Sequence, residues 1–396
     1  MKQMNSKIQI LFVSHNLPER GAPHHYIPAI WLSREGYDVV CLCPDSGDGL
    51  EQVDGWQDMG RLDLRRVIAS NRLICELKML LHLLRLRISF GSSALYYVYG
   101  SRICSVAWIA LLGMRRNRII YHTQDFLEPR RHKFYEFFEK RLAKRAGFVI
   151  INDENRARFM KSHYDLVQLP TSVRTYLPAS WKIPDFDANK RIELLSTLGV
   201  KMTGDEKLIM CQTAYSPVRC SENLIKAVAL LGKNYYLVFS GMESGSAGER
   251  LAKEAVSRHG VIDRSLFLGY LPYTDLLGYT AVCDIGVLLY ANDGIGNFYQ
   301  CPGRLTEYLR CGISVVMSDF PNFRYLALKY RIGVTCDSES PTSIAKAIEE
   351  LGSRPPDQIQ ADRKRLKQLT INELCYEKEF TKLKEVLVAA MGREDN

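Results

Sequence analysis

The sequence predicts an α/β protein made of two Rossmann-like domains that face each other across a cleft. Short apolar runs alternate with helical apolar periodicity along the whole chain, which is typical of βαβ units. The chain has 396 residues, more than one ordinary core holds. Residues 168–189 contain Pro170, Pro178 and Pro184 without clear periodicity, and we interpret them as the linker between two alternating halves.

The first half opens with a strand, a helix and a strand. Residues 8–13 form an apolar run typical of a buried parallel strand, apolar residues recur at helical spacing over residues 26–36, and residues 37–43 predict the next strand. Further strands are expected over residues 94–99, 118–121 and 148–151, and a further helix through residues 134–142. This order predicts that the strands share one parallel sheet.

A basic amphipathic helix is expected after the second strand. Ser70 or Asn71 can cap its start, and Lys78, His82 and Arg85 lie on its polar face. Its apolar face comprises Leu73, Leu77, Leu80 or Leu81, Leu84 and Ile88. Such a helix can pack into the core with a solvated basic side, or it can lie on an anionic membrane surface. The sequence leaves both alternatives open.

The second half restarts the same alternation. Its expected strands are residues 208–211, 236–240, 265–268, 285–289, 314–317 and 334–335, and its expected helices are residues 222–231, 248–259, 306–311 and 343–351. We therefore predict one domain over residues 1–187 and a second over residues 188–371. Residues 372–396 predict a charged amphipathic helix that packs back on the first domain.

Positive charge is concentrated in the first half. The chain has a net charge of +9 at pH 7, and residues 61–145 contain 18 Lys and Arg against 6 Asp and Glu. Such a field favours an anionic partner. No zinc-finger spacing, RNA-recognition motif or basic helix-turn-helix is present, so no nucleic-acid partner is expected. Basic clusters at residues 115–118 and 130–133 indicate either a solvated basic surface or reversible docking on an anionic membrane, and the sequence leaves both open.

Two features predict a cytoplasmic protein. The apolar runs at residues 8–13 and 107–114 are too short for a signal peptide or a membrane span. The eleven cysteines show no CxxC or Cys/His ligand spacing, which predicts reduced thiols and no metal site. Peripheral attachment to the inner face of the plasma membrane is an open alternative to a purely cytoplasmic location.

Four segments of the second half carry a recognisable pattern. They are residues 235–241, 268–277, 283–290 and 302–308, the last with the sequence PGRLTEY. Their order and spacing resemble the donor-binding domain of GT-B glycosyltransferases, especially bacterial enzymes of the group 1 and family 4-like type. The resemblance covers nearly the whole chain and is sharpest over residues 208–319. It implies a GT-B fold with the acceptor in the first domain and the nucleotide sugar in the second.

The resemblance also implies an activity. A hexosyltransferase-like enzyme of this type moves a sugar from a nucleotide-diphosphate sugar to the hydroxyl of a sugar, lipid-linked or small-molecule acceptor, in bacterial polysaccharide, glycolipid or glycosylated-metabolite biosynthesis. No Asp-x-Asp pair stands beside a strand, so we expect no metal and no cofactor besides the donor substrate. Two alternatives stay open: a nucleotide-sugar epimerase or hydrolase of the same fold, and a non-catalytic partner of another glycosyltransferase.

The resemblance assigns donor contacts to individual residues. Glu307 stands where the family places the acid that binds ribose, and an ionised carboxylate can accept both ribose hydroxyls; a solvated or capping glutamate is the alternative. Arg304 and Arg219 are candidates for the diphosphate, although Arg219 can equally be a surface arginine. The other expected contacts are Gly21 near the diphosphate, Gly241 after a strand, Leu271 through its backbone to the base, and Gly296 and Asn297 in a glycine loop that can equally be a turn.

The candidate catalytic residues follow a strand of the first half. They are His122, Gln124 and Asp125, and Gln124 stands where the family commonly has a histidine. In an inverting enzyme His122 or Asp125 would deprotonate the acceptor hydroxyl, whereas in a retaining enzyme a donor phosphate oxygen can take that proton. Retaining members typically have two glutamates near the helix start. Glu307 matches the second and Tyr299 occupies the first, and we favour the retaining reaction.

Overall fold

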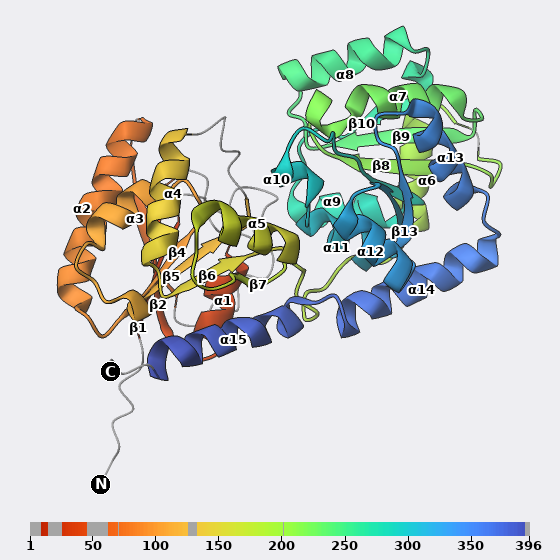
Figure 1. The fold of residues 1–396 in the computed structure, drawn as a ribbon. Coiled ribbons are helices and arrows are strands. Elements are labelled where there is room, and N and C mark those ends of the chain that lie inside the picture. The colour runs from red at the N-terminus through yellow and green to blue at the C-terminus, as the bar shows by residue number, and fades with distance from the viewer. Residues whose placement is uncertain are drawn as a thin grey trace. The chain divides into compact units, whose positions relative to one another are not determined.

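The chain folds into two compact units. The structure is a computed structural model that describes residues 9–14, 26–45, 62–69, 71–125, 133–200 and 202–392. Unit 1 comprises Met1–Thr175 together with Tyr376–Asn396, and unit 2 comprises Tyr176–Cys375. The sequence pattern placed the corresponding borders at residues 187 and 371. Each unit has its own parallel sheet covered by helices, as the α/β prediction requires (Figure 1).

Within the described residues, unit 1 is built on a seven-stranded parallel sheet. Its strands are β1 (Gln9–Ser14), β2 (Asp38–Pro44), β3 (Leu62–Val67), β4 (Leu95–Tyr99), β5 (Ile119–Thr123), β6 (Phe148–Ile151) and β7 (Thr171–Ser172), in the order β3-β2-β1-β4-β5-β6-β7. Strand β1 pairs with β2 and with β4, so that Ile10 is aligned with Val39 on one side and with Leu95 on the other. Strands β4 and β5 are buried at every residue, because helices cover both faces of a parallel sheet.

The helices of unit 1 follow the strands in regular alternation. They are α1 (Ile27–Arg34), α2 (Arg72–Phe90), α3 (Cys104–Ala110), α4 (Lys133–Arg145), α5 (Glu154–Tyr164) and α15 (Tyr376–Gly392), with the short 3-10 helix η4 (Arg116–Arg118) before β5. Asn71 caps α2, because its side chain accepts a hydrogen bond from the N–H of Ile74 at 3.0 Å. The other candidate cap, Ser70, lies outside the described residues.

The predicted apolar face of helix α2 does not pack into the core, so that alternative is wrong. The core side of the helix carries Cys75, Met79 and Leu83, which are buried. The predicted apolar face points to solvent instead, and Leu73 and Ile88 are 79% and 83% exposed. The helix therefore has two apolar faces, and the face with fewer leucines, which carries Cys75, Met79 and Leu83, packs on the sheet. Among the described residues, no helix is long and apolar enough to cross a membrane.

Helix α15 belongs to unit 1 although it follows unit 2 in the chain. The ring of Tyr376 packs edge-on against Trp31 of α1, with ring centroids 5.3 Å apart. Lys384 forms an ion pair with Glu35 at 2.7 Å. The carboxylate of Glu379 accepts a hydrogen bond from the backbone N–H of Arg174 at 2.9 Å. One aromatic contact and two polar contacts thus fasten the helix to the start and the end of the first segment of unit 1.

Unit 2 contains a six-stranded parallel sheet among its described residues. Its strands are β8 (Lys207–Gln212), β9 (Tyr235–Ser240), β10 (Ser265–Phe267), β11 (Ile285–Leu288), β12 (Ser314–Ser318) and β13 (Gly333–Cys336), in the order β10-β9-β8-β11-β12-β13. Its helices are α6 (Ala188–Thr197), α7 (Ser221–Leu230), α8 (Ala247–Arg258), α9 (Tyr273–Ala281), α10 (Ile295–Phe298), α11 (Gly303–Arg310), α12 (Pro321–Tyr330), α13 (Pro341–Gly352) and α14 (Pro356–Asn372).

Two apolar cores cover the two faces of this sheet. One joins α7, α8 and α13 to side chains such as Ile209 and Leu237. The other joins α6, α11, α12 and α14 to side chains such as Met210 and Val315. Successive strand residues point to opposite faces, which accounts for the alternation between the two cores. Strand order changes direction between β8 and β11, and the carboxyl ends of these strands carry the candidate site.

Candidate functional site

The first turn of α11 is fixed to the carboxyl end of β8. Arg304 donates a hydrogen bond from Nη1 to the carbonyl oxygen of Gln212 and another from Nη2 to the hydroxyl of Tyr290, the latter at 3.0 Å. The hydroxyl of Tyr308 accepts from the N–H of Gln212 at 3.1 Å and donates to the carbonyl oxygen of Met210 at 3.2 Å. These bonds hold the PGRLTEY segment at the edge of the sheet where parallel α/β domains bind ligands.

Tyr308 reaches this position because β11 carries a glycine beneath its ring. A Cβ atom at Gly286 would lie 2.7 Å from Cγ of Tyr308, closer than two carbon atoms can pack. Gly286 therefore sets how near α11 lies to the sheet, and hence where Arg304 and Glu307 lie.

Glu307 is a buried carboxyl group in α11, only 3% exposed. The hydroxyl of Tyr273, at the start of α9, donates a hydrogen bond to its Oε1 at 3.3 Å. Burial raises the pKa of Glu307 to about 7, although the charge of Arg304 and the hydrogen bond from Tyr273 oppose the shift. Glu307 is thus neither a solvated glutamate nor a helix cap. A desolvated carboxylate of this kind gains from any hydroxyl that donates to it.

Tyr290 brings the two candidate arginines together. Arg219, in the 3-10 helix η5 (Pro217–Arg219) after β8, lies over the ring of Tyr290 with its Cζ 4.3 Å from the ring centroid. Arg304 donates to the hydroxyl of the same ring. A ring face attracts a cation, and a phenolic oxygen accepts from one, so a single side chain orients both guanidinium groups. Two cations held this close favour an anionic ligand such as a diphosphate.

Gly241 and Leu271 lie on two adjacent loops at the same edge. Gly241 follows β9 with a φ of 95°, and a Cβ on it would lie 3.7 Å from the backbone N of Thr213, which follows β8. Its N–H donates to the carbonyl oxygen of Gly269 at 3.0 Å. Leu271 follows Gly269 after β10, so its backbone shares this loop. A left-handed backbone at Gly241 permits this close approach of two loops.

The segment expected as a glycine loop forms a short helix. Gly294 precedes α10, which contains Gly296 and Asn297, so the loop interpretation of these two residues is wrong. The amide of Asn297 donates to Asp293 at 2.5 Å and accepts from the amide of Gln300 at 3.2 Å. Hydrogen bonds at each end of the amide thus orient Asn297 within the segment that leads to α11.

The unit 1 candidates lie at the end of β5. His122 is 2% exposed, and its Nδ1 is hydrogen bonded to the hydroxyl of Tyr97 at 2.6 Å. Burial lowers the pKa of His122 to about 3. An imidazole with such a pKa is a weak base, which argues against His122 as the group that deprotonates an acceptor.

Gln124 and Asp125 continue the chain beyond β5. Gln124 is partly buried and its carbonyl oxygen accepts a hydrogen bond from Arg156 at 2.6 Å, while Asp125 is exposed. The hydroxyl of Thr123 donates to the carbonyl oxygen of Asp125 at 2.7 Å, which closes the turn. The carboxylate of Asp125 is therefore the accessible acid of the three candidates. Gly21 lies outside the described residues.

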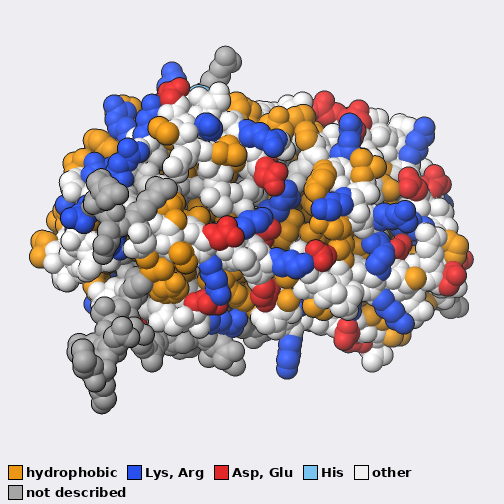
Figure 2. Space-filling view, turned by 60° about the horizontal axis from the view of Figure 1, so that its bottom comes forward, with side chains coloured by type: hydrophobic (Ala, Val, Ile, Leu, Met, Phe, Trp, Pro, Cys, Tyr) orange, Lys and Arg blue, Asp and Glu red, His pale blue; other side chains and the backbone are white. Residues whose placement is uncertain are grey.

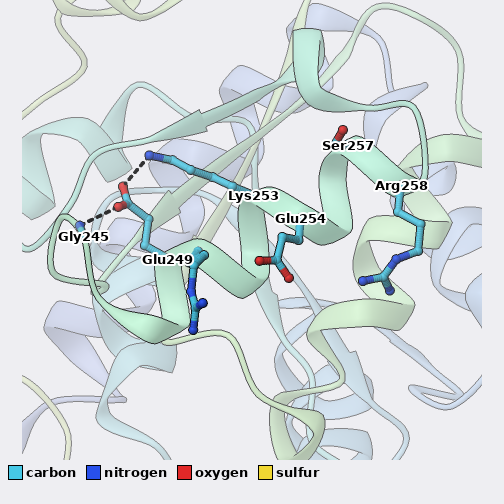
Figure 3. Close-up of a pocket in the computed structure, with 7 residues that line it drawn as sticks. Gly245, Glu249, Lys253, Glu254, Ser257 and Arg258 are labelled. Atoms are coloured by element: carbon cyan, nitrogen blue, oxygen red, sulfur yellow. Dashed lines mark hydrogen bonds and ion pairs between the residues drawn. The ribbon is translucent and has the colours of Figure 1, made fainter.

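A hollow of about 790 Å³ runs along α8, away from the residues discussed above (Figure 3). Its lining is Gly245, Glu249, Arg250, Lys253, Glu254, Ser257 and Arg258. Glu249 accepts from the N–H of Gly245 at 2.7 Å and pairs with Lys253 at 3.0 Å, as the dashed lines in Figure 3 mark. These contacts satisfy the start of α8, and charged side chains of both signs line the rest of the hollow. It has the character of a solvated helix face.

Two site residues were not singled out from the sequence. Tyr290 follows a buried strand at its carboxyl end, a position that could have identified it. Tyr273 contacts Glu307 across 34 residues of chain, and no local pattern signals that contact. In the part of the chain that the structure describes, no group of three or more His, Cys, Asp or Glu residues can hold a metal ion. Metal independence itself stays a prediction.

Comparison with known proteins identifies a family for part of the chain and a fold for the whole of it. Residues 201–370 match the family model of glycosyl transferases group 1. The fold is similar to that of Anabaena Alr3699/HepE, solved in complex with UDP-glucose, with a TM-score of 0.75, 16% identity, and 96% and 100% of the two chains covered. No curated protein matches the sequence.

Two further solved structures have a similar fold. Sucrose-phosphate synthase from Thermosynechococcus elongatus has a TM-score of 0.70 and 16% identity over 97% of this chain and 100% of its own. WaaG, a glycosyltransferase involved in lipopolysaccharide biosynthesis, has a TM-score of 0.68 and 13% identity over 95% and 99% of the two chains.

These findings confirm the fold and the resemblance. The protein has the GT-B fold, with two Rossmann-like units, and its residues 201–370 carry the sequence pattern of glycosyl transferases group 1. The matched segment includes β8 to β13 and therefore every donor-binding candidate of unit 2. The class of enzyme that the fold and the matched segment support is a glycosyltransferase.

Proposed function

We propose that the protein transfers a hexosyl group from a nucleotide-diphosphate sugar to an acceptor hydroxyl. The observation that carries this proposal is the buried carboxyl group of Glu307, which interacts with the charge of Arg304, at the carboxyl edge of the unit 2 sheet, where Tyr290 links Arg304 to Arg219. A nucleotide sugar needs an acceptor for its ribose hydroxyls and cations for its diphosphate, and this edge offers both.

In the proposed complex each part of the donor has its own partners in the site. Glu307 accepts hydrogen bonds from the two ribose hydroxyls, and Arg304 and Arg219 compensate the charge of the diphosphate. In this proposal the backbone at Leu271 contacts the base, and Gly241, Gly296 and Asn297 bind the sugar diphosphate. Gly21 stays a candidate for the diphosphate from the sequence alone, because it lies outside the described residues. HepE has been solved with UDP-glucose, and a trehalose-6-phosphate protein from E. coli with UDP-2-fluoro glucose. UDP-glucose is therefore the first donor to test.

The proposed reaction is retaining and metal-independent. The acceptor oxygen forms the new glycosidic bond while the bond between the anomeric carbon and the diphosphate breaks, and the departing phosphate oxygen takes the proton of the acceptor hydroxyl. The arginines stabilise the negative charge that builds up on the diphosphate. This route needs no side-chain base, which is consistent with the low pKa of the buried His122. Asp125 would be that base in the inverting alternative, with Gln124 beside it.

The acceptor belongs to bacterial polysaccharide, glycolipid or glycosylated-metabolite biosynthesis in this proposal, and unit 1 binds it. We propose a cytoplasmic enzyme that can attach to the inner face of the plasma membrane. Asp125→Asn separates the two stereochemical routes. A general base contributes about 100-fold or more to the rate, so the retaining route predicts less than about a tenfold loss. Product anomers analysed by NMR decide the same question independently.

Donor binding tests the central assignment. Thermal-shift measurements with UDP, UDP-glucose, GDP and dTDP should show a stabilising shift for one nucleotide, because a ligand that binds the folded state raises its stability. Glu307→Ala should abolish that shift, while the exposed Glu350→Ala on α13 should leave it unchanged. An unaltered shift in Glu307→Ala would contradict the proposed donor site.

Turnover experiments address the two remaining alternatives. Consumption of the bound nucleotide sugar without any acceptor would favour an epimerase or hydrolase. Nucleotide binding without turnover across acceptors of the three classes would favour a non-catalytic partner.

A further inference from the structure

Helix α2 exposes a continuous apolar stripe. Leu73, Leu77, Leu81 and Ile88 are 79%, 58%, 48% and 83% exposed, and Leu84 between them is partly exposed. Their spacing places them on one side of the helix over all of its turns. Single exposed leucines are common on protein surfaces, but a contiguous row of them marks an interaction site.

The fold does not need this stripe. The opposite side of α2 buries Cys75, Met79 and Leu83 against unit 1 and is sufficient to hold the helix on the sheet. The N-terminal end is held by the Asn71 cap and the C-terminal end by Arg87, which donates to the carbonyl oxygen of Ala110 at 2.6 Å. The helix is thus anchored without its leucine stripe, which is available to a partner.

The apolar surface continues over the two neighbouring helices. Helix α3 and the residues after it expose Ile109 and Leu112, and α4 exposes Phe134 and Phe137, each more than 40% exposed. The three helices are neighbours on unit 1 (Figure 1). We call the exposed apolar residues of α2, α3 and α4 the α2–α4 surface.

Basic side chains border the α2–α4 surface. Lys78 and Arg85 are exposed and lie on the flank of the leucine stripe. The single acid of α2, Glu76, pairs with Arg72 at 3.1 Å. On α4, Arg141 lies over the exposed ring of Phe137, 3.4 Å from its centroid.

A space-filling view shows the same mixture of basic and hydrophobic side chains. Lys and Arg side chains gather among hydrophobic ones over the α2 side of unit 1, on the left of the view (Figure 2). The exposed surface therefore combines apolar contact area with positive charge, the two properties that hold an amphipathic helix at the interface of an anionic membrane.

We propose that the α2–α4 surface docks on a bilayer that contains anionic phospholipid. The aliphatic and phenyl side chains enter the boundary between headgroups and acyl chains, and Lys78 and Arg85 contact lipid phosphates. Charge excludes the competing occupant, a second copy of the chain. A two-fold contact through this surface would place its basic residues against one another. The proposal does not depend on the donor site.

Vesicle sedimentation with the full chain tests the contribution of the apolar stripe. The protein should bind vesicles of phosphatidylcholine with phosphatidylglycerol and should not bind phosphatidylcholine alone. Leu77→Glu with Leu81→Glu should lower the partition coefficient at least about tenfold, because two leucines lose burial and two repelled charges are added. Leu328→Glu on α12, at a leucine that is 77% exposed in unit 2, is the matched control and should bind as the unaltered chain does.

A second pair of variants tests the charge. Lys78→Gln with Arg85→Gln should lower binding about 25-fold at low salt, since each cation near an anionic surface contributes about fivefold. Added salt should reduce the binding of the unaltered chain in the same direction. Thermal denaturation of each variant verifies its fold, and all four substituted positions are exposed.

Site-specific labelling reports insertion directly. All eleven native cysteines are buried, so Ile88→Cys provides an accessible thiol for an environment-sensitive fluorophore. Its emission should shift to the blue on anionic vesicles, whereas a label at Leu328→Cys should not respond.

Three results would overturn the proposal. They are equal binding to vesicles with and without phosphatidylglycerol, binding that survives the glutamate pair, and a dimer in analytical ultracentrifugation without lipid that the glutamate pair dissociates. The last would assign the α2–α4 surface to a second copy. Donor thermal shifts, measured on the same variants, stay unchanged in every case, which keeps this test separate from that of the donor site.

Discussion

The hydroxyl of Tyr290 accepts a hydrogen bond from Nη2 of Arg304 at 3.0 Å. The same ring lies beneath Arg219, 4.3 Å from its Cζ. One side chain therefore couples the two cations of the candidate site, one through its edge and one through its face.

Tyr290→Phe should weaken donor binding about tenfold. The change removes a hydrogen bond to a charged donor and keeps the ring under Arg219, so Arg304 loses orientation while Arg219 does not. Isothermal titration with the nucleotide identified by thermal shift measures the effect. Tyr279→Phe is a matched control, because Lys190 lies 4.3 Å from that ring and its hydroxyl donates to Glu193 at 3.4 Å, remote from the site. An equal loss in the control would show a nonspecific effect.

Glu307→Gln should stabilise the ligand-free protein at alkaline pH while abolishing donor binding. The pKa of Glu307 is raised from 4.5 to about 7 by burial, so the carboxyl is neutral in the folded protein where it is already ionised in the unfolded chain. The free energy of unfolding therefore decreases by about 3 kcal/mol in total as the pH rises from 4.5 through 7. Denaturant unfolding near pH 5 and pH 9 should show a gain for the variant only at the higher pH.

Glu206→Gln is a control for that experiment, because the pKa of Glu206 is lowered whereas that of Glu307 is raised. Burial acts to raise the pKa of Glu206, but hydrogen bonds from Thr203 and Gly204 outweigh it, and the pKa is lowered. This carboxylate stabilises the fold above its unfolded pKa, so Glu206→Gln should lower stability at the higher pH. Equal losses in both variants would refute the raised pKa of Glu307.

His122 should stay neutral far below neutral pH. Burial lowers its pKa to about 3, so acidification below about 6.5 charges the unfolded state only, and each pH unit removes about 1.4 kcal/mol of stability. NMR titration of the imidazole, assigned with His122→Gln, checks the protonation state. An inflection of its chemical shift between pH 6 and 7 would contradict the prediction.

Gly286→Ala should lower both stability and donor affinity. The new methyl group would lie 2.7 Å from the ring of Tyr308, and moving α11 away from the sheet costs about 1 to 3 kcal/mol. Thermal unfolding and donor titration measure the two effects. Gly392→Ala, where no atom lies within 4 Å of the new Cβ, is the control and should change neither quantity.

Much of the fold could be predicted from local sequence. Apolar runs predicted the central strands of both sheets because a strand covered on both faces, such as β4, is apolar at each position. Strand β3 was missed, since its sequence LDLRRV places polar residues on an exposed face at the sheet edge. Helix α2 was predicted with its capping residue, but the face with more leucines is exposed and the face with Cys75, Met79 and Leu83 is buried, so tertiary packing decides which face is covered.

The candidate site was predictable only in part. Glu307 and Arg304 lie in a contiguous motif that a resemblance can identify. Tyr273 and Tyr290 act through contacts between segments far apart in the chain, which no local spacing encodes. The short helix at Gly296 and Asn297 was expected to be a loop, because two closely spaced glycines resemble a turn in sequence.

Unit 1 is assembled from two stretches of chain with the whole of unit 2 between them. Tyr376 and Lys384 contact Trp31 and Glu35, which a ribosome synthesises more than three hundred residues earlier. Unit 2 is therefore complete before α15 emerges, and the unit that begins first finishes last. Until then the side of α1 that α15 covers is exposed to solvent, so this surface of the nascent chain is open to aggregation and is a target for chaperones.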